Sequence, residues 1–417
     1  MTFDTVVVGA GLAGLCAALR LADEGQRVLV VARGVGATHL APATVDVLGY
    51  APGRVESPEH ALAELVSARP GHPYARLGPV VVSASLAWLR ERVPELGFSG
   101  GLAENVLLPT AVGVAKPSAL APAAMAGGDL RAGGRFAFVG LRGLKDFYPA
   151  YLAANLNRAE LPVAVEARAI ELSPPADGRV DVGGPGFARL FENASFRETV
   201  ARELAPRLEP GERVGFPAVL GLTDADVVRR ELEERLERPV FEVATLPPSV
   251  PGIRLHAALT AHLRRRAARV IVGDPVVGAE TDRRRVVAVV AQTAARRVAY
   301  RARSFLLATG GLASGGIELD SRRGVREPIL DLAVTSPGSD GPLYRPGYFD
   351  DHPLAAAGLS VDGRLRPVDR SGVAAFENLY AAGALLGGAV PWREHSGTGI
   401  SVATGYAAAA AILEGAS

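Results

Sequence analysis

FDTVVVGAGLAGLCAALRLADEGQRVLVVARG, residues 3–34, decides the fold. The apolar run at its start predicts a buried parallel strand, the periodic apolar residues after it predict a helix, and VLVV predicts a second buried strand. Gly9, Gly11 and Gly14 are spaced as G-x-G-x-x-G between the first strand and the helix. In dinucleotide-binding folds these glycines permit a tight turn, close approach of a pyrophosphate, and close packing of helix on strand. The stretch therefore predicts a βαβ unit whose helix N-terminus offers free N–H groups to a phosphate.

The second strand ends in Ala32, Arg33 and Gly34, where an acidic residue usually grips the adenosine ribose. Three ligands remain open at this point. FAD would need another ribose partner, such as the backbone of Ala32 and Arg33. NADP would place its 2′-phosphate on Arg33, and FMN has no adenosine to hold.

Two further glycine elements in the last third of the chain favour a flavin. A-T-G-G follows the apolar run 304–307, and a strand-like run ends in glycine at 378–383, before a helix predicted over 399–413. A flavoprotein needs this strand–glycine–helix element, whose helix N-terminus stabilises negative charge on the reduced ring, and an NADP dehydrogenase does not. The Asp that usually binds the ribityl chain there is replaced by Ala384. The cofactor-binding residues assigned in this region are Gly310, Gly311, Gly383, Gly399, Ile400 and Ser401.

Composition limits the classes of function. The 417 residues carry a net charge of +1, so no global field attracts nucleic acid. Cys16 is the only cysteine, which excludes disulfides and an iron–sulfur cluster held by this chain alone. No apolar run of about 20 residues escapes interruption, so we expect no membrane span. The chain opens directly into a strand, so we also expect no signal peptide and a cytoplasmic location. No metal site is predicted.

The chain has the rhythm of a nucleotide domain interrupted by an insertion. Strand-like runs alternate with helical ones between residues 131 and 249, for example RFAFVGL at 135–141 and the amphipathic segment 224–236. A β-meander is expected over 276–302. We therefore predict an α/β, doubly wound Rossmann-like FAD/NAD(P)-binding flavoprotein fold with a β-meander and an inserted α/β domain. The expected division is 1–130 and 250–417 for the flavin domain and 131–249 for the insertion.

Several longer stretches carry a family resemblance. They are HPYARL (72–77), GLRGLKDFYPAYLAANL (140–156), TLPPSVPGIRL (245–255), GVREPIL (324–330) and ENLYAAGALLGG (377–388). With FDTVVVGAGLAGL (3–15), they resemble the B-subunit of bacterial anaerobic glycerol-3-phosphate dehydrogenase nearly from end to end. That family also lacks both acids. The loop 390–397 departs from the family pattern, which is often glycine-rich and carries a cysteine.

The resemblance implies a function and partners. The family's complex oxidises sn-glycerol 3-phosphate to dihydroxyacetone phosphate and passes electrons to quinone in anaerobic respiration. The B-subunit is associated with FMN, although the fold also allows FAD. Its partners are a catalytic FAD subunit and an iron–sulfur subunit that anchors the complex at the cytoplasmic face of the inner membrane. Two alternatives stay open: a stand-alone flavin oxidoreductase of the fumarate-reductase or L-aspartate-oxidase type, and a non-catalytic electron-relay or structural subunit.

Three residues are candidates for the chemistry. A flavin that oxidises an alcohol needs a nearby base, and a phosphate substrate needs Arg or Lys. His395 precedes the flavin-facing helix and is the candidate base, against the alternative of a surface histidine. Arg254 is a candidate phosphate ligand or a bridge between domains. Arg326 is a candidate phosphate ligand or the partner of Glu327 in an internal ion pair.

A histidine soon after the second strand raises the question of a covalent flavin. In the succinate dehydrogenase group such a histidine carries the flavin, and Thr38-His39 lies at a comparable distance in this chain. Both residues are therefore assigned to cofactor binding, with a non-covalent contact as the alternative.

Overall fold

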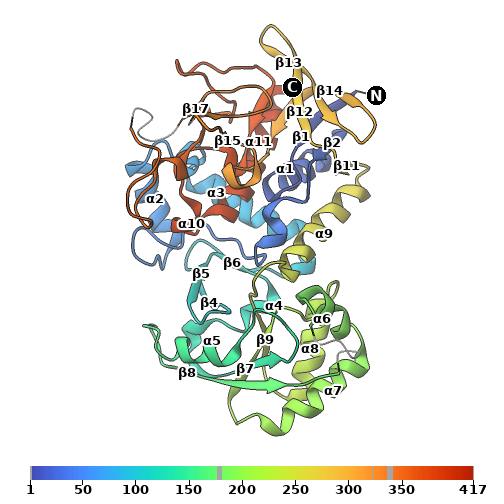
Figure 1. Cartoon of the computed structure of the whole chain (residues 1–417), viewed down its shortest axis with the longest axis vertical. Coiled ribbons are helices and arrows are strands. Elements are labelled where there is room, and N and C mark those ends of the chain that lie inside the picture. The colour runs from blue at the N-terminus through green and yellow to red at the C-terminus, as the bar shows by residue number, and fades with distance from the viewer. Residues whose placement is uncertain (1, 176–180, 323, 336–340, 417) are drawn as a thin grey trace.

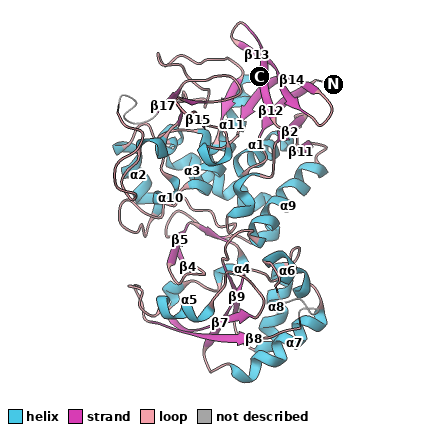
Figure 2. Cartoon of the chain, in the orientation of Figure 1, coloured by secondary structure: helices cyan, strands magenta, loops and turns pink. Residues whose placement is uncertain are grey.

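The computed structural model describes residues 2–175, 181–322, 324–335 and 341–416. They form two lobes stacked along the long axis of the molecule (Figure 1). The upper lobe contains both termini and the first and last parts of the chain, and the lower lobe contains the middle part. Figure 2 shows sheets with helices around them in both lobes.

The upper lobe is built on a seven-stranded sheet of order β11-β2-β1-β14-β13-β12, with β19 paired to β14. Strands β11, β2, β1, β14 and β19 run parallel, and β12–β13–β14 form an antiparallel meander. The bounds are β1 (Phe3–Val8), β2 (Val28–Ala32), β11 (Arg269–Val272), β12 (Val276–Asp282), β13 (Arg285–Gln292), β14 (Arg297–Leu307) and β19 (Leu379–Ala381). The predicted nucleotide-binding sheet and its β-meander are both confirmed.

Helices cover this sheet and close the upper core. Helix α1 packs on α11, because both present runs of small apolar side chains to each other. The helices are α1 (Leu12–Asp23), α2 (Pro58–Ala68), α3 (Pro73–Arg92), α9 (Val250–Arg265), α10 (Pro391–Glu394) and α11 (Gly397–Ala416), with the 3₁₀ turn η1 (Gly36–Leu40) after β2. Short pairs are β3 (Ser99–Gly100) with β6 (Leu120–Ala121), β15 (Glu318–Leu319) with β16 (Val325–Arg326), and β17 (Val334–Thr335) with β18 (Gly358–Leu359).

The lower lobe has its own four-stranded parallel sheet of order β10-β9-β7-β8. Its core is aromatic: Phe136, Phe138 and Phe241 pack together on one side, and Phe191, Phe196 and Phe216 on the other. The elements are β7 (Gly134–Leu141), β8 (Val165–Leu172), β9 (Glu212–Pro217), β10 (Val240–Val243), α4 (Ala123–Ala126), α5 (Pro149–Leu156), α6 (Gly184–Phe191), α7 (Ala194–Leu204) and α8 (Ala225–Leu236).

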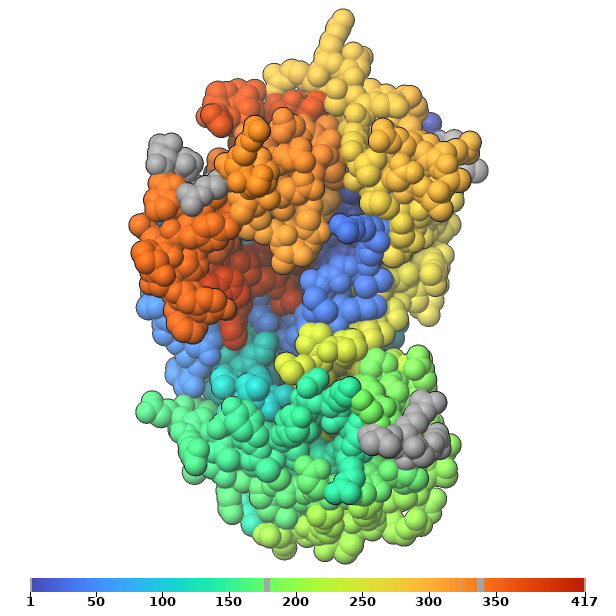
Figure 3. Space-filling view, in the orientation of Figure 1, coloured from blue at the N-terminus to red at the C-terminus, as the bar shows by residue number. Residues whose placement is uncertain are grey.

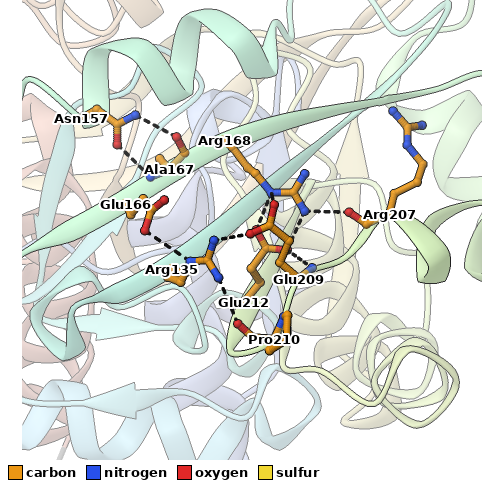
Figure 4. A network of polar contacts seen from close by, with 9 residues as sticks. All are labelled: Arg135, Asn157, Glu166, Ala167, Arg168, Arg207, Glu209, Pro210 and Glu212. Carbon is orange, nitrogen blue, oxygen red and sulfur yellow. Dashed lines mark hydrogen bonds and ion pairs between the residues drawn. The ribbon is translucent and has the colours of Figure 1, made fainter.

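A polar network ties three strands of the lower sheet together (Figure 4). Glu212 is buried, and its carboxylate receives two hydrogen bonds from Arg168 at 2.5 and 2.7 Å. Arg135 pairs with Glu209 and Glu166 beside it. Burial alone would raise the pKa of Glu212, but the Arg168 guanidinium and the Glu209 N–H outweigh burial and lower it. The network serves the fold of this lobe.

The hairpin β4 (Val106–Pro109) and β5 (Ala115–Ser118) lies where the lobes meet (Figure 1). Leu107 packs in one cluster with Phe136 and Phe241 of the lower lobe, and Leu120, just after the hairpin, pairs with Val45 of the upper lobe. Domain boundaries at residues 131 and 249 remain a proposal, and this packing favours an earlier start of the inserted unit.

Local differences from the sequence-based expectation have local causes. The sequence pattern of residues 144–156 predicts a helix, but α5 begins only at Pro149, because Asp146 has a φ of +61° and proline suits the first helical position. The pattern of residues 161–167 predicts a strand, and β8 spans 165–172. The Gly- and Pro-rich segment 35–130 predicts loops and short helices, but it contains the 20-residue α3, which is interrupted by Gly78 at φ +75°.

Candidate functional site

A cavity of about 1280 Å³ opens in the upper lobe. Its walls come from the start of α1, the segment after β2, the segment after β14, and the α10–α11 region. In Figure 3 the dark red atoms of the C-terminal region lie between an orange segment and a blue one. The cavity has one end lined by glycines and another lined by polar side chains.

At the glycine-lined end the backbone leaves no room for a side chain at Gly9 or Gly14. Gly9 has a φ of +117°, and a Cβ there would lie 2.2 Å from the Ala308 carbonyl oxygen. A Cβ on Gly14 would lie 2.1 Å from the Gly9 oxygen, so this glycine serves helix–strand packing. A Cβ on Gly11 would meet nothing within 4 Å, and this residue lines the cavity. The N-terminus of α1 has no side-chain cap. Open N–H groups beside free space fit a pyrophosphate.

The cavity continues along the segment after β2. Ala32, Arg33, Gly34 and Thr38 all line it. Arg33 is exposed, and the Thr38 hydroxyl is buried without a hydrogen-bond partner in the described part of the chain. A cavity that reaches the end of the second strand has room for the adenosine half of a dinucleotide.

The segment after β14 and the start of α11 form the opposite wall. Gly310, Gly383 and Ser401 line the cavity. Gly383 has a φ of +75°, and its N–H donates to the Thr404 hydroxyl at 2.8 Å. The Thr309 hydroxyl is another buried polar atom without a partner among the described residues. Glycine backbone and the unpartnered Thr309 hydroxyl along this wall fit a flat, polar-edged group such as a flavin.

The polar end is a cluster of four side chains. Asp46 Oδ1 accepts from Lys116 Nζ at 2.5 Å, from the Ser118 hydroxyl at 2.7 Å and from the Thr44 hydroxyl at 2.9 Å. Lys116 also donates to the two hydroxyls at 2.8 and 2.9 Å. Lys116 and Ser118 belong to β5, and Asp46 belongs to the upper lobe, so the cluster joins the upper lobe to the hairpin between the lobes. Sequence reasoning missed it, because no spacing links positions 70 residues apart.

His395 lies at this polar end. It lines the cavity, is half-buried and has a φ of +48°. Burial and the Lys116 ammonium lower its pKa and outweigh Asp46, which raises it. A neutral imidazole in the cavity is able to accept a proton. The alternative of a plain surface histidine does not describe this position.

Glu394 holds the turn that presents His395. Its carboxylate binds His72 Nε2 at 3.1 Å, Arg69 at 2.7 Å and the Ser396 hydroxyl at 2.9 Å. His72 Nδ1 accepts the Tyr74 N–H, so Nε2 carries the proton donated to Glu394. Burial alone would raise the pKa of Glu394, but the hydrogen bonds from His72, the Val390 N–H and Arg69 lower it to about 2.

Arg254 bridges the lobes. Its guanidinium, 9% exposed, makes two hydrogen bonds of 2.7 and 2.8 Å to the buried Glu242 and one of 2.8 Å to the Gly221 oxygen. Of the two alternatives open for Arg254, the contacts match the bridge between domains, since both partner residues, Glu242 and Gly221, lie in the lower lobe. It is not among the residues that line the cavity.

Arg326 does line the cavity, but its partner differs from the expected one. It pairs with Glu318 across the β15–β16 pair at 2.8 Å. The expected Arg326–Glu327 ion pair is wrong. Glu327 is fully buried and accepts the N–H groups of Ile329 and Leu330, while burial raises its pKa.

Several assigned cofactor residues lie behind the wall instead of on it. The His39 ring packs edge-on against His256 at 4.8 Å, and both Nε2 atoms are buried without a partner among the described residues. Burial lowers the pKa of His256 to about 4. A Cβ on Gly399 would strike the Tyr74 hydroxyl, the Asp46 oxygen and Val47. The assigned residues that do not line the cavity are Gly14, His39, Gly311, Gly399 and Ile400.

Neither a metal centre nor a membrane-spanning helix is found in the described part of the chain. No group of three or more His, Cys, Asp or Glu side chains among these residues is placed to hold a metal ion. None of the helices described is both long and apolar enough to cross a membrane.

The sequence matches the model of the FAD binding domain family over residues 4–400. The chain is thus a flavin-binding protein of the oxidoreductase class, and FAD is the more specific of the two expected flavins. A protein of Halobacterium salinarum named as a probable B-subunit of anaerobic glycerol-3-phosphate dehydrogenase is 36% identical over 425 residues, which cover 99% of this chain and 98% of the relative. This chain belongs to the family of anaerobic glycerol-3-phosphate dehydrogenase B-subunits, which confirms the resemblance seen in the sequence.

A second relative and a solved structure complete the comparison. The protein named as the B-subunit of anaerobic glycerol-3-phosphate dehydrogenase in Yersinia pseudotuberculosis serotype I is 32% identical over 427 residues, 99% of this chain and 98% of the relative. The open conformation of a flavocytochrome c3 fumarate reductase is 10% identical, with a TM-score of 0.47 over 100% of this chain and 79% of that one.

Proposed function

We propose that this chain is the flavin-binding subunit of a respiratory glycerol-3-phosphate dehydrogenase and that its own cavity oxidises sn-glycerol 3-phosphate to dihydroxyacetone phosphate. One observation carries the proposal: a single cavity joins a glycine-lined end that fits a dinucleotide to a polar end with a neutral histidine. A relay subunit would need the first end and not the second. The full-length similarity to proteins named as B-subunits of this dehydrogenase supports the choice of substrate.

The residues divide the work. Gly11 and the α1 N-terminus would hold the pyrophosphate, while Gly310, Gly383 and Ser401 would face the rest of the cofactor. A bound flavin would supply the two-electron acceptor for the oxidation of the alcohol. His395 accepts the hydroxyl proton as the C=O bond forms, which balances the oxidation. Arg326, whose present partner is exposed, is the proposed ligand of the substrate phosphate.

The proposed complex contains two partners besides this chain. They are a catalytic FAD subunit and an iron–sulfur subunit that anchors the assembly at the cytoplasmic face of the inner membrane. Cys16 is the only cysteine of this chain and is buried, so the metal centres that carry electrons toward quinone must belong to another subunit. The relatives are named as lettered subunits, which supports an assembly of several chains.

The test is cofactor identification followed by anaerobic reduction. The full-length chain is purified without its partner subunits, the flavin is released by denaturation and identified by chromatography, and an intact mass shows whether any flavin stays attached. We expect non-covalent FAD. Glycerol 3-phosphate should then bleach the absorbance of the flavin in this chain, whereas succinate should not. A chain that retains no flavin, or a flavin that glycerol 3-phosphate leaves oxidised, would overturn the proposal.

A further inference from the structure

The carboxylate of Asp46 has two oxygens in different situations. Oδ1 accepts three hydrogen bonds from Lys116, Ser118 and Thr44. Oδ2 accepts none from the described residues, and it is not among the buried polar atoms that lack a partner. Asp46 lines the cavity and its side chain is 13% exposed. One oxygen is therefore anchored in the protein, and the other is open to the cavity.

The cluster is built to hold this carboxylate in one orientation. Ser118 is fully buried behind it, and its hydroxyl donates to Oδ1. The backbone N–H of Asp46 donates to the Thr398 hydroxyl at 2.7 Å, and the backbone carbonyl oxygen of Asp46 accepts the Gly399 N–H at 3.0 Å. Both the backbone and the side chain of Asp46 are thus fixed against the start of α11. A group fixed from behind with one free acceptor is suited to orienting a ligand.

The chemistry of the free oxygen limits what it binds. An ionised carboxylate only accepts hydrogen bonds, so its ligand must offer a donor. A phosphate would be repelled by the like charge. The three N–H donors of Lys116 are all engaged, by Asp46 and the two hydroxyls, so the ammonium has none left for an anion. The free oxygen therefore needs an O–H or N–H donor, and on the proposed substrate the only such donors are hydroxyls.

We propose that Asp46 Oδ2 accepts a hydrogen bond from the second, non-reacting hydroxyl of a polyol phosphate and so sets the substrate specificity of the cavity. The inference rests on the proposed function, which gives His395 the proton of the reacting hydroxyl. Glycerol 3-phosphate carries two hydroxyls, a reacting one for His395 and a terminal one for Asp46. The product, dihydroxyacetone phosphate, keeps the terminal hydroxyl assigned to Asp46. Lys116, Thr44 and Ser118 position the carboxylate.

Product binding tests this without turnover. The full-length chain with its oxidised flavin, purified without the partner subunits, is titrated with dihydroxyacetone phosphate and with acetol phosphate, which lacks only the terminal hydroxyl. Binding is followed by flavin absorbance or calorimetry. We expect the wild type to prefer dihydroxyacetone phosphate by about 10- to 100-fold, because a hydrogen bond to a charged acceptor is lost with the analogue. In Asp46→Asn that preference should fall to about threefold or less.

Two further variants complete the design. Asp46→Glu keeps a carboxylate near Lys116 but moves its free oxygen, so the preference should also fall while the flavin content stays normal. Glu280→Gln removes an exposed acid on β12 and should keep the wild-type preference. A preference retained in both Asp46 variants, or equal weakening of the two ligands, would overturn the inference while leaving the proposed function standing. Failure of the wild type to bind either ligand would overturn both.

Discussion

The two ends of the cavity are made of different material. The end that fits the pyrophosphate is backbone: Gly9 and Gly11 shape it, and a single extra carbon on Gly9 would collide with the Ala308 oxygen. The polar end is made of side chains, and Asp46 of the upper lobe and Lys116 of the β4–β5 hairpin meet there from distant parts of the sequence. A site made of backbone depends on glycines that lack a Cβ. A site made of side chains depends on the fold bringing together groups that are distant in the sequence. The two ends should therefore fail in different ways when they are changed.

Gly9→Ala should give the largest effect. The new Cβ would be 2.2 Å from a backbone oxygen at a φ of +117°, where side chains are strained. We expect the free energy of unfolding to fall by about 4 kcal/mol or more, with loss of flavin. Urea denaturation and flavin absorbance measure the two changes.

Gly11→Ala is the matched control, because its Cβ would meet no protein atom within 4 Å. It should lower the flavin content and change the free energy of unfolding by less than about 1 kcal/mol. If Gly9→Ala unfolds at the same urea concentration as the wild type, the close contact between residue 9 and the Ala308 oxygen does not determine the shape of the glycine-lined end.

Arg254→Met should give the next largest effect, since the polar end needs both lobes in register. The change leaves Glu242 buried without its partner, and breaking a buried ion pair costs about 3–4 kcal/mol. Arg301→Met, which breaks an exposed pair with Glu280, should cost less than about 1 kcal/mol. Thermal unfolding of both variants measures the difference. Similar melting temperatures would mean that Arg254 does not hold the lobes together.

The polar end should also respond to acid, and the glycine-lined end should not. The pKa of Glu394 is about 2 in the folded chain, against 4.5 ordinarily. A lowered carboxyl pKa stabilises the fold above pH 4.5, and this stabilisation is lost as the pH falls from 4.5 to 2. The shift corresponds to a contribution on the order of 3 kcal/mol to the free energy of unfolding.

Glu394→Gln removes this titrating group and so tests the acid response. Urea denaturation of wild type and variant at pH 7, 5 and 3 should show a difference that shrinks toward pH 3. A difference that is constant over this range would show that Glu394 is not the source.

These contrasts explain what the sequence could predict. Gly9, Gly11, Gly310 and Gly383 were found because a backbone site leaves its glycines at fixed distances from predictable strands. Asp46 and Lys116 were missed, because a lone Asp and a lone Lys have no spacing and become neighbours only when the hairpin β4–β5 lies between the lobes.

Residues near a motif were assigned less accurately than those within it. Gly399 and Ile400 follow the expected glycine element, yet one packs on Tyr74 and the other is in the core. Arg254 stands in a stretch typical of the family, but its partners in the lower lobe follow from how the lobes pack. The sequence therefore predicted the fold and one end of the cavity, while the other end required the tertiary structure.

Arg326→Gln should give the smallest change in stability and sharpens the comparison at the cavity mouth. Arg326 and its partner Glu318 are 59% and 46% exposed, so their ion pair is screened by water and its loss should cost less than about 0.5 kcal/mol. A guanidinium held so weakly is free to exchange Glu318 for a substrate phosphate, with which it forms stronger paired hydrogen bonds. We therefore expect KM for glycerol 3-phosphate to rise about tenfold, as in the loss of one charge-assisted hydrogen bond, with little change in kcat.

Arg27→Gln is the control for this prediction, because Arg27 is an exposed arginine paired with Asp4 and is not among the residues that line the cavity. It should change neither KM nor the melting temperature. An unchanged KM in Arg326→Gln would mean that the phosphate is held elsewhere. Arg33, the other arginine on the cavity wall, lies at the end of β2, where the adenosine half of FAD is expected. A substrate phosphate bound at Arg33 would compete with FAD for the same wall. An unchanged KM in Arg326→Gln would therefore favour FMN, which fills a shorter part of the cavity.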